Sequence, residues 1–436
     1  MNIGVYSISR YRSTEKNKRG FVLILLLAMY SCGTLSSFTS SWTVTYALTA
    51  LAVAGMLMIK LCVRKGELEI DRISVFWMIM TIICFANSFR NSYYQDLVMF
   101  TLCTLVIMLF NDLSTDSLFS LFPLLTWVSV FFTLGELWQY FFTDAYYRYL
   151  YPLFGDYYKQ AIRRQFYFHK MCTGFTSQTV VSAEFIIIGF CAVYCMMPFV
   201  DRKRRVQMLL LELFFIAGVL LTGKRSSPLL IIIAYFFVET RSTVPSKRFR
   251  RVANIVLVAA VVTVVVYFIV MPRFIGSRNS IVRFIEYFQN DEADVTNGRL
   301  NIYIVSFDAF KQSPVLGRGW GWVKKNTNYM GAHNIYLQLL CECGIVGSIP
   351  FFAAFAGALM SVLRHMKMMV SYGNTVIMAI LKFSLFTQVF ILVYGLVGNP
   401  IYDYNYLIWY VIAVCMDLCA GRMIMRERSA AYGRKG

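Results

Sequence analysis

The chain has 436 residues, of which 58% are hydrophobic and 15% are charged, and its mean hydropathy is +0.58. A soluble protein of this length carries about 25% charged residues, so the composition excludes an ordinary soluble enzyme. The formal net charge of +19 does not indicate nucleic-acid binding, because most Lys and Arg residues lie in short tracts between apolar runs.

Twelve apolar segments predict membrane-spanning helices. Most approach the length of about 20 residues that a helix needs to cross a bilayer. No cleavage site of small residues follows the first segment, so we expect a retained anchor and not a signal peptide. The predicted fold class is an all-α polytopic membrane protein of about twelve helices. In chain order the segments are 20–37, 42–63, 73–89, 95–111, 117–140, 179–200, 206–222, 227–240, 252–271, 345–363, 375–397 and 406–421.

The distribution of Lys and Arg predicts the orientation of these helices. One set of connections, together with both termini, carries 24 Lys and Arg residues, whereas the short connections on the opposite side carry only Arg90, Lys224 and Arg225. Positive residues concentrate on the cytoplasmic side of membrane proteins. We therefore expect both termini in the cytoplasm, with residues 422–436 as a basic cytoplasmic tail.

The first long segment on the outer side covers residues 141–178 and contains thirteen aromatic residues. Two interpretations remain open for it. It is either an amphipathic element that lies in the headgroup layer, or a surface whose aromatic rings stack on sugars and whose cations contact an anionic lipid head group. Arg163 and Arg164 are candidate substrate-binding residues in the second interpretation.

The second outer segment, residues 272–344, is the longest stretch outside the predicted spans. It lies between the ninth and tenth spans and carries eight basic and six acidic residues. A loop of this length with helices of its own is usually functional, so we expect a functional extracytoplasmic loop here. It separates a membrane domain at 1–271, which holds spans one to nine, from spans ten to twelve at 345–421.

The later part of this loop has an ordered pattern. After Gly298, five apolar residues recur at helical spacing and predict a helix, which Pro314 and the Gly-rich stretch after it end. A polar turn and the run that begins with His333 follow. The five apolar residues are Leu300, Tyr303, Ile304, Phe307 and Phe310.

Several short motifs resemble the signature of bacterial O-antigen ligases and O-antigen polymerases. The resemblance of motifs covers roughly residues 170–350, and the rest of the chain is similar only in hydropathy. The spacing of the proline- and glycine-containing motif from the histidine motif is its most specific part. The motifs are Gly298-Arg299-Leu300, Ser313-Pro314-Val315-Leu316-Gly317-Arg318-Gly319, His333-Asn334-Ile335-Tyr336-Leu337-Gln338, Glu342-Cys343-Gly344-Ile345-Val346-Gly347, Leu221-Thr222-Gly223-Lys224-Arg225-Ser226-Ser227 and the weaker Gly174-Phe175-Thr176.

This resemblance implies a GT-C-like glycosyltransferase of the bacterial cytoplasmic membrane. The implied substrate is a glycan on undecaprenyl diphosphate, which serves as donor and, in a polymerase, also as acceptor, on the outer side of the membrane. The lipid bilayer is a partner, and a flippase and a chain-length regulator are further expected partners. No nucleic acid is expected. No Cys/His spacing resembles a zinc site and no Asp-rich metal loop is present, so we expect neither a metal nor another cofactor.

The resemblance also assigns roles to individual residues. Arg225 and Arg299 would bind the diphosphate, because the planar fork of arginine matches phosphate oxygens, and Lys224 would assist them. His333 would be the general base that removes the proton of the acceptor hydroxyl. Arg318, Asn334 and Tyr336 are further candidates for substrate binding.

Each assignment has a structural alternative. Arg225 could extend to the headgroups, Arg299 could pair locally with Asp294, and His333 could be a hydrogen-bonded turn residue. We expect Glu342 to anchor the loop to the following helix and not to act as an acid. Four ionisable residues inside predicted spans are functional suspects by position alone. They are Glu136, Glu184, Glu212 and Lys382.

Other function classes fit less well. A transporter of twelve spans often has two similar halves and ionisable residues near the midplane, whereas here the long loop lies between spans nine and ten and its polar residues concentrate at the boundary. A non-enzymatic scaffold or sensor would not need the Gly, His and Arg motifs. Between the two enzymes we predict the polymerase, of O-antigen or capsule type, over the O-antigen ligase that transfers the glycan to lipid A–core.

Overall fold

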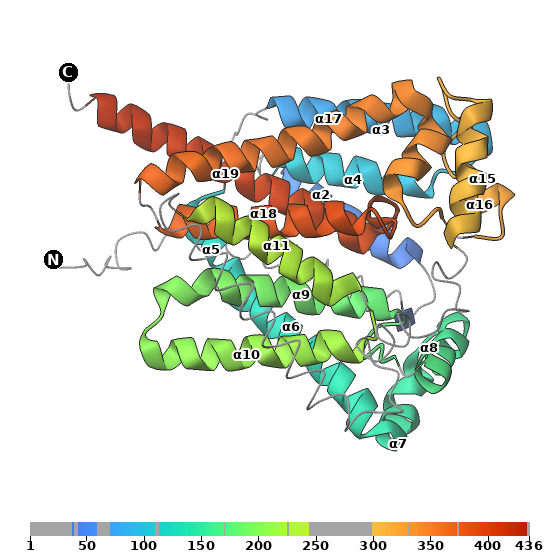
Figure 1. Cartoon of the computed structure of the whole chain (residues 1–436), viewed down its shortest axis with the longest axis horizontal. Helices are drawn as coiled ribbons and strands as arrows, with labels where there is room; N and C mark the ends of the chain where they lie inside the picture. The colour runs from blue at the N-terminus through green and yellow to red at the C-terminus, as the bar shows by residue number, and fades with distance from the viewer. Residues whose placement is uncertain are drawn as a thin grey trace.

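The computed structural model describes residues 37–38, 42–58, 70–109, 113–169, 171–224, 226–243, 299–329, 331–372 and 375–433. These residues form helices and connecting turns, with no β-strand among them. Most helices run side by side as a bundle (Figure 1). The helical class predicted from the sequence is confirmed for this part of the chain.

Ten of the twelve predicted segments coincide with helices. Segment 252–271 and all but the last residue of 20–37 lie outside the described residues. Within the described ranges, six helical stretches are long and apolar enough to cross a membrane, at residues 72–91, 115–141, 179–199, 335–370, 375–394 and 404–427. The bundle helices are α2 (Trp42–Met58), α3 (Arg72–Asn91), α4 (Gln95–Leu109), α5 (Thr115–Phe119), α6 (Leu121–Phe141), α9 (Thr179–Met196), α10 (Arg202–Leu221), α11 (Ser226–Ser242), α17 (Ile335–Tyr372), α18 (Thr375–Tyr394) and α19 (Tyr404–Gly433).

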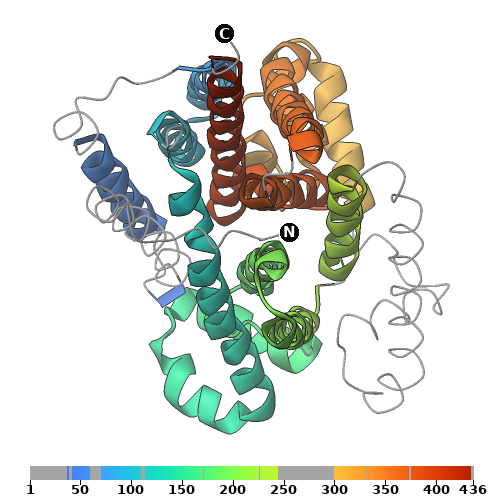
Figure 2. The same ribbon diagram turned by 90° about the vertical axis from the view of Figure 1, so that its left-hand side faces the viewer.

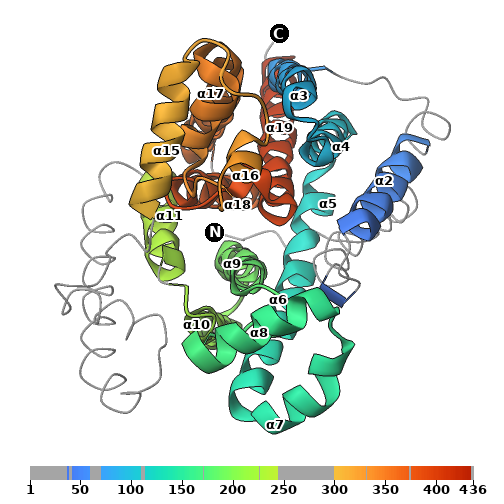
Figure 3. The same ribbon diagram turned by 90° about the vertical axis from the view of Figure 1, so that its right-hand side faces the viewer.

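Helix α9 lies inside the bundle, and nearly all of its side chains are buried. In the end-on views it is surrounded by α6, α10, α11 and α18 (Figures 2 and 3). Its Gly189 allows a close approach to α6, since a Cβ there would lie 2.1 Å from the Cβ of Ser129. The Ser129 hydroxyl donates to the Phe185 carbonyl at 2.6 Å. A small residue and a hydroxyl at the contact are typical of helices packed in membranes.

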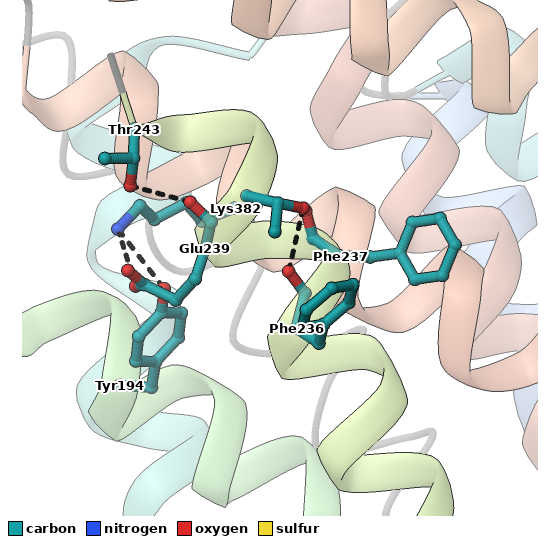
Figure 4. Close-up of polar contacts among 7 residues, drawn as sticks. Tyr194, Phe236, Phe237, Glu239, Thr243 and Lys382 are labelled. Atoms are coloured by element: carbon teal, nitrogen blue, oxygen red, sulfur yellow. Dashed lines mark hydrogen bonds and ion pairs between the residues drawn. The ribbon is translucent and has the colours of Figure 1, made fainter. Parts of the chain in front are cut away.

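A buried polar cluster joins α9, α11 and α18 away from the long loops (Figure 4). Lys382 Nζ lies 3.5 Å from Glu239 Oε1 and donates to the Tyr194 hydroxyl at 3.2 Å. The Tyr194 hydroxyl in turn donates to Glu239. Lys382, an ionisable residue that the sequence places inside a span, therefore has partners on two other helices, as a charge in an apolar interior requires.

The long connections gather at one end of the bundle, which we call the loop end. Helices α7 (Thr143–Ala145), α8 (Asp156–His169), α15 (Arg299–Gln312) and α16 (Trp322–Asn326) lie there, on the right in Figure 1 and toward the viewer in Figure 3. The N-terminal ends of α9 and α11 and the C-terminal ends of α10 and α18 also lie at the loop end. The loop end thus brings together segments that are up to about 250 residues apart in the sequence.

Helix α15 confirms the helix predicted after Gly298, but the side that it buries is a different one. Its buried residues are Ile302, Ser306 and Ala309, whereas Leu300 and Phe307 of the predicted apolar face are about half exposed. Small side chains at 306 and 309 let α15 pack closely on its neighbours. Of the predicted face, Leu300, Ile304 and Phe307 are exposed, whereas Tyr303 is partly buried and packs against the cluster of Ile302 and Ala309.

Candidate functional site

The turn after α10 packs against the segment that follows α8. The Cys172 amide donates to the Leu221 carbonyl at 3.0 Å. Gly223 has a φ of +69°, and a Cβ there would lie 2.4 Å from Met171 Cγ. Glycine is therefore required at this position for both its conformation and its size. Lys224 follows directly, so this packing places the predicted cation turn at the loop end; Arg225 lies outside the described residues.

The weaker Gly-Phe-Thr motif lies in the same segment and is held by α6. Gln139 Oε1 accepts hydrogen bonds from the amides of Thr173 at 2.6 Å and Gly174 at 3.0 Å. The hydroxyl of Tyr146 donates to the Gly174 carbonyl at 2.7 Å. Two motifs that are about 50 residues apart in the sequence therefore pack together beside the cation turn, where Thr173 and Thr176 are buried.

The Pro-x-x-Gly-x-Gly turn lies against a break in α17. Gly344, inside that helix, is non-helical with φ 66°, and a Cβ there would lie 2.4 Å from the Val315 carbonyl oxygen. The Ile345 amide donates to the Pro314 carbonyl at 2.8 Å, and the Gly319 amide donates to the Glu342 carbonyl at 2.8 Å. The turn thus takes up hydrogen bonds that the helix break releases, which explains why both partners contain glycine.

His333 lies in the turn before α17 and has a φ of +53°. This left-handed conformation is uncommon for residues other than glycine, although His, Asn and Asp adopt it more readily than most. Asn334 Oδ1 accepts hydrogen bonds from the amides of Tyr336 at 3.1 Å and Leu337 at 3.0 Å, which is a standard N-cap arrangement. The hydroxyl of Tyr303 donates to the His333 carbonyl at 3.3 Å, so α15 contacts the same turn.

The start of α17 is also fixed to the end of α18. The Ile335 amide donates to the Gly395 carbonyl at 2.8 Å, and the Tyr336 hydroxyl donates to the Leu392 carbonyl at 2.7 Å. Asn334 Oδ1 and the Tyr336 hydroxyl, which belong to two predicted substrate-binding candidates, thus help to hold the turn. His333 is exposed at this turn.

Two predicted cations lie close enough to His333 to change its titration. Partial removal from water lowers the pKa of His333 below its ordinary value of 6.5, and the positive charges of Arg299 and Lys224 lower it further. Arg299 forms no ion pair with any described carboxylate; Asp294, its possible local partner, lies outside the described residues. The structure therefore places Arg299 and Lys224, from two other segments, within electrostatic range of His333, and the positive charge of the two side chains suits an anion.

We expect Lys224→Met to raise the pKa of His333 toward 6.5. The lysine charge disfavours the imidazolium, so its removal makes protonation easier and moves the titration to higher pH. The measurement is a pH titration of ¹³C-labelled histidines by NMR, with His333 assigned by its loss in His333→Gln. Lys311→Met, on the far end of α15 and paired with Asp308 at 2.7 Å, is the control. If the pKa of His333 is unchanged in Lys224→Met, Lys224 does not contribute to this site.

Three further predicted site residues, Arg163, Arg164 and Arg318, are not joined to this group by any described contact. Arg163 and Arg164 lie on the exposed face of α8, and the guanidinium of Arg163 lies over the Tyr167 ring at 5.9 Å. Arg318 donates to Gln312, and its guanidinium lies 5.9 Å from the centre of the Trp322 ring. Arg318 thus connects α15 with α16, while α8 belongs to the same end of the bundle.

Tyr394 at the end of α18 and Tyr406 at the start of α19 are further residues near Arg299 that the sequence does not predict. The Tyr394 side chain lies within electrostatic range of Arg299, and also of Glu184 and Asp403, and its ring stacks on that of Tyr406 at 4.8 Å. No local signal marks Tyr394, since it lies 60 residues beyond the histidine motif. Glu184, in contrast, could be predicted as a candidate because it is an ionisable residue inside a predicted span.

Glu342 anchors the loop, as predicted from the sequence. It is fully buried, accepts a hydrogen bond from the Tyr402 hydroxyl at 3.0 Å, and accepts another from the Val323 amide at 3.3 Å. Glu342 therefore connects α16, α17 and the segment before α19. Among the described residues, no group of three or more His, Cys, Asp or Glu side chains is arranged to hold a metal ion.

Comparison with known proteins gives one match. Residues 210–352 match the family model described as O-antigen ligase, and no curated protein matches the chain. The matched stretch begins in α10, ends in α17 and contains Lys224, Arg299 and His333. The apolar helices and this match together indicate an integral membrane protein with a glycan ligase or polymerase type of function. The chain carries an O-antigen ligase family domain at residues 210–352, in agreement with the resemblance seen in its motifs.

Proposed function

We propose that the protein is a glycosyltransferase that polymerises oligosaccharide repeat units carried on undecaprenyl diphosphate. The convergence of Arg299 and Lys224 on His333, within the family match, is the observation that carries the proposal. It combines positive charges that can bind an anion with a base whose pKa is lowered, at one end of the helix bundle. The products would be O-antigen or capsular polysaccharide.

The proposed chemistry is a single inverting displacement without a metal. Negative charge grows on the diphosphate as the glycosidic bond breaks, and Arg225, Arg299 and Lys224 stabilise it near the low-dielectric interface. His333 removes the proton of the attacking hydroxyl. Because the pKa of His333 lies below 6.5, its imidazole is mostly neutral at neutral pH and can accept that proton.

The acceptor distinguishes the two candidate enzymes. A polymerase transfers the growing glycan to a second lipid-linked unit, whereas a ligase transfers it to lipid A–core. We favour the polymerase because it does not require an outer membrane. Neighbouring genes for a flippase and a chain-length regulator would support this choice, and lipid A–core genes would support the ligase. A transporter is the second alternative, and the exposed histidine within electrostatic range of two cations favours chemistry over transport.

Purified protein should form polymer from lipid-linked repeat units alone, in the presence of excess chelator. The cations of the protein, and not a divalent ion, neutralise the diphosphate in this proposal. The measurement is the chain-length distribution of the product on a gel, with and without added lipid A–core. Product only with lipid A–core would identify a ligase. Activity that chelator removes and magnesium restores would show that a metal neutralises the diphosphate.

We further propose that the loop end faces away from the cytoplasm in the bacterial cytoplasmic membrane, with both termini inside. A reporter that is active only outside the cytoplasm should be active when fused after Asn290 and silent after Lys203. The four consecutive basic residues of 202–205 hold their connection in the cytoplasm. A silent fusion at Asn290 with an active one at Lys203 would reverse the orientation and remove the loop from the outer side.

A further inference from the structure

The left-handed backbone at His333 must be held by its surroundings. The residue before it, Ala332, is buried and has an amide that donates to Gln338 Oε1 at 2.9 Å. Gln338 is a buried residue on the first turns of α17. A Cβ at Gly331 would lie 3.0 Å from the same Gln338 oxygen. The Gln338 side chain therefore extends back to the turn and fixes the backbone immediately before His333.

The amide of Gln338 has only one orientation that satisfies its neighbours. Its oxygen accepts from the Ala332 amide, so its NH₂ group faces Glu342, and it donates to Glu342 Oε1 at 3.3 Å. Glu342 lies one helical turn further on the same face of α17 and is itself held by Tyr402 and Val323. A carboxylate at 338 cannot donate to Glu342, and an apolar side chain can neither donate nor accept.

We propose that Gln338, oriented by Glu342, is a positioning residue for His333. It fixes the backbone that aims the imidazole, while the cations that bind the diphosphate lie on other segments. This inference rests on the proposed role of His333 as base. Because a displacement of about 1 Å can cost about 100-fold in rate, loss of the Gln338 contact should reduce turnover and leave the affinity for the lipid-linked donor unchanged.

The first experiment is Gln338→Leu, with turnover and donor affinity measured separately. We expect kcat to fall by about 10- to 100-fold, with donor Kd within about twofold of the wild type. The matched control is Gln388→Leu in α18, another fully buried glutamine, whose NH₂ group donates to Ser384 Oγ at 3.1 Å and which does not contact the turn. Gln388→Leu should keep its turnover. An equal loss in both variants would mean a general packing effect and would overturn the proposal.

The second experiment combines Gln338→Leu with His333→Gln. If Gln338 acts through His333, the double variant should be no slower than His333→Gln alone, because the positioned group is already absent. Losses that multiply would overturn the proposal. This result is separate from the proposed function: a His333→Gln variant with normal turnover would refute the base assignment, whatever Gln338→Leu does.

Conservative variants keep the proposal testable if Gln338→Leu does not fold. Glu342→Gln retains an oxygen that can accept from Gln338 and should keep most of the turnover. Gln338→Glu retains the acceptor for Ala332 but places a carboxylate against Glu342, and should lose turnover and shift the titration of His333. Full activity in a folded Gln338→Glu protein, shown by a monodisperse peak in size-exclusion chromatography, would contradict the proposed orientation by Glu342.

Discussion

His333→Gln should lose transfer activity by about 10²- to 10⁴-fold, the usual contribution of general-base catalysis, and still bind the lipid-linked donor. The imidazole is exposed in a turn that Tyr303, Asn334 and Gly395 support, so the side chain can change without loss of the fold. Binding of donor and single turnover should be measured on the same preparation. In the wild type, activity should fall as pH drops through the pKa of His333, which lies below 6.5.

The sign of this pH dependence follows from the chemistry. The base must be neutral, and a lowered pKa keeps it neutral to lower pH, so the activity should persist below pH 6.5 before it falls. If His333→Gln keeps its turnover and loses donor affinity instead, His333 binds phosphate or supports the turn. Glu184, buried in α9 and within electrostatic range of Tyr394, would then be the next residue to test as the base.

Arg299→Ala should abolish glycan transfer in a protein that still folds and inserts. Arg299 is the first residue of α15 and is only partly buried, and its charge acts on both His333 and Tyr394. Its removal should weaken donor binding and also raise the pKa of His333 toward 6.5. Arg225→Ala should give a similar loss. Polymer formation and donor affinity are the two measurements.

Arg299→Lys should restore little of this activity, because a lysine is a point charge and lacks the planar fork that binds two phosphate oxygens. Lys311→Ala is the control on the same helix, since Lys311 is exposed and pairs with Asp308. It should retain activity. Near-normal chain formation by Arg299→Ala would remove Arg299 from the mechanism and leave Arg225 and Lys224 to neutralise the diphosphate.

The long apolar segments and the motif residues could be predicted from the sequence because each rests on local information. Helices such as α9, α18 and α19 have a composition that only a membrane or a protein interior stabilises. The helix at 299–312 followed from periodicity, and its end followed from Pro314 and Gly317. The buried face of α15 could not be predicted, because Ser306 and Ala309 are buried by close packing and not by their hydrophobicity.

The sequence by itself determined the class of the protein, its family domain, and the identities of Lys224, Arg299 and His333 as candidates, since these depend on composition and on short motifs. Only the tertiary structure shows that Lys224 and Arg299 lie within electrostatic range of His333. It also decided that Gln338 holds the His333 turn, and that the end of α18 supports it through Gly395. Such contacts join segments that are far apart in the sequence, and their geometry depends on how the helices pack, which no local pattern encodes.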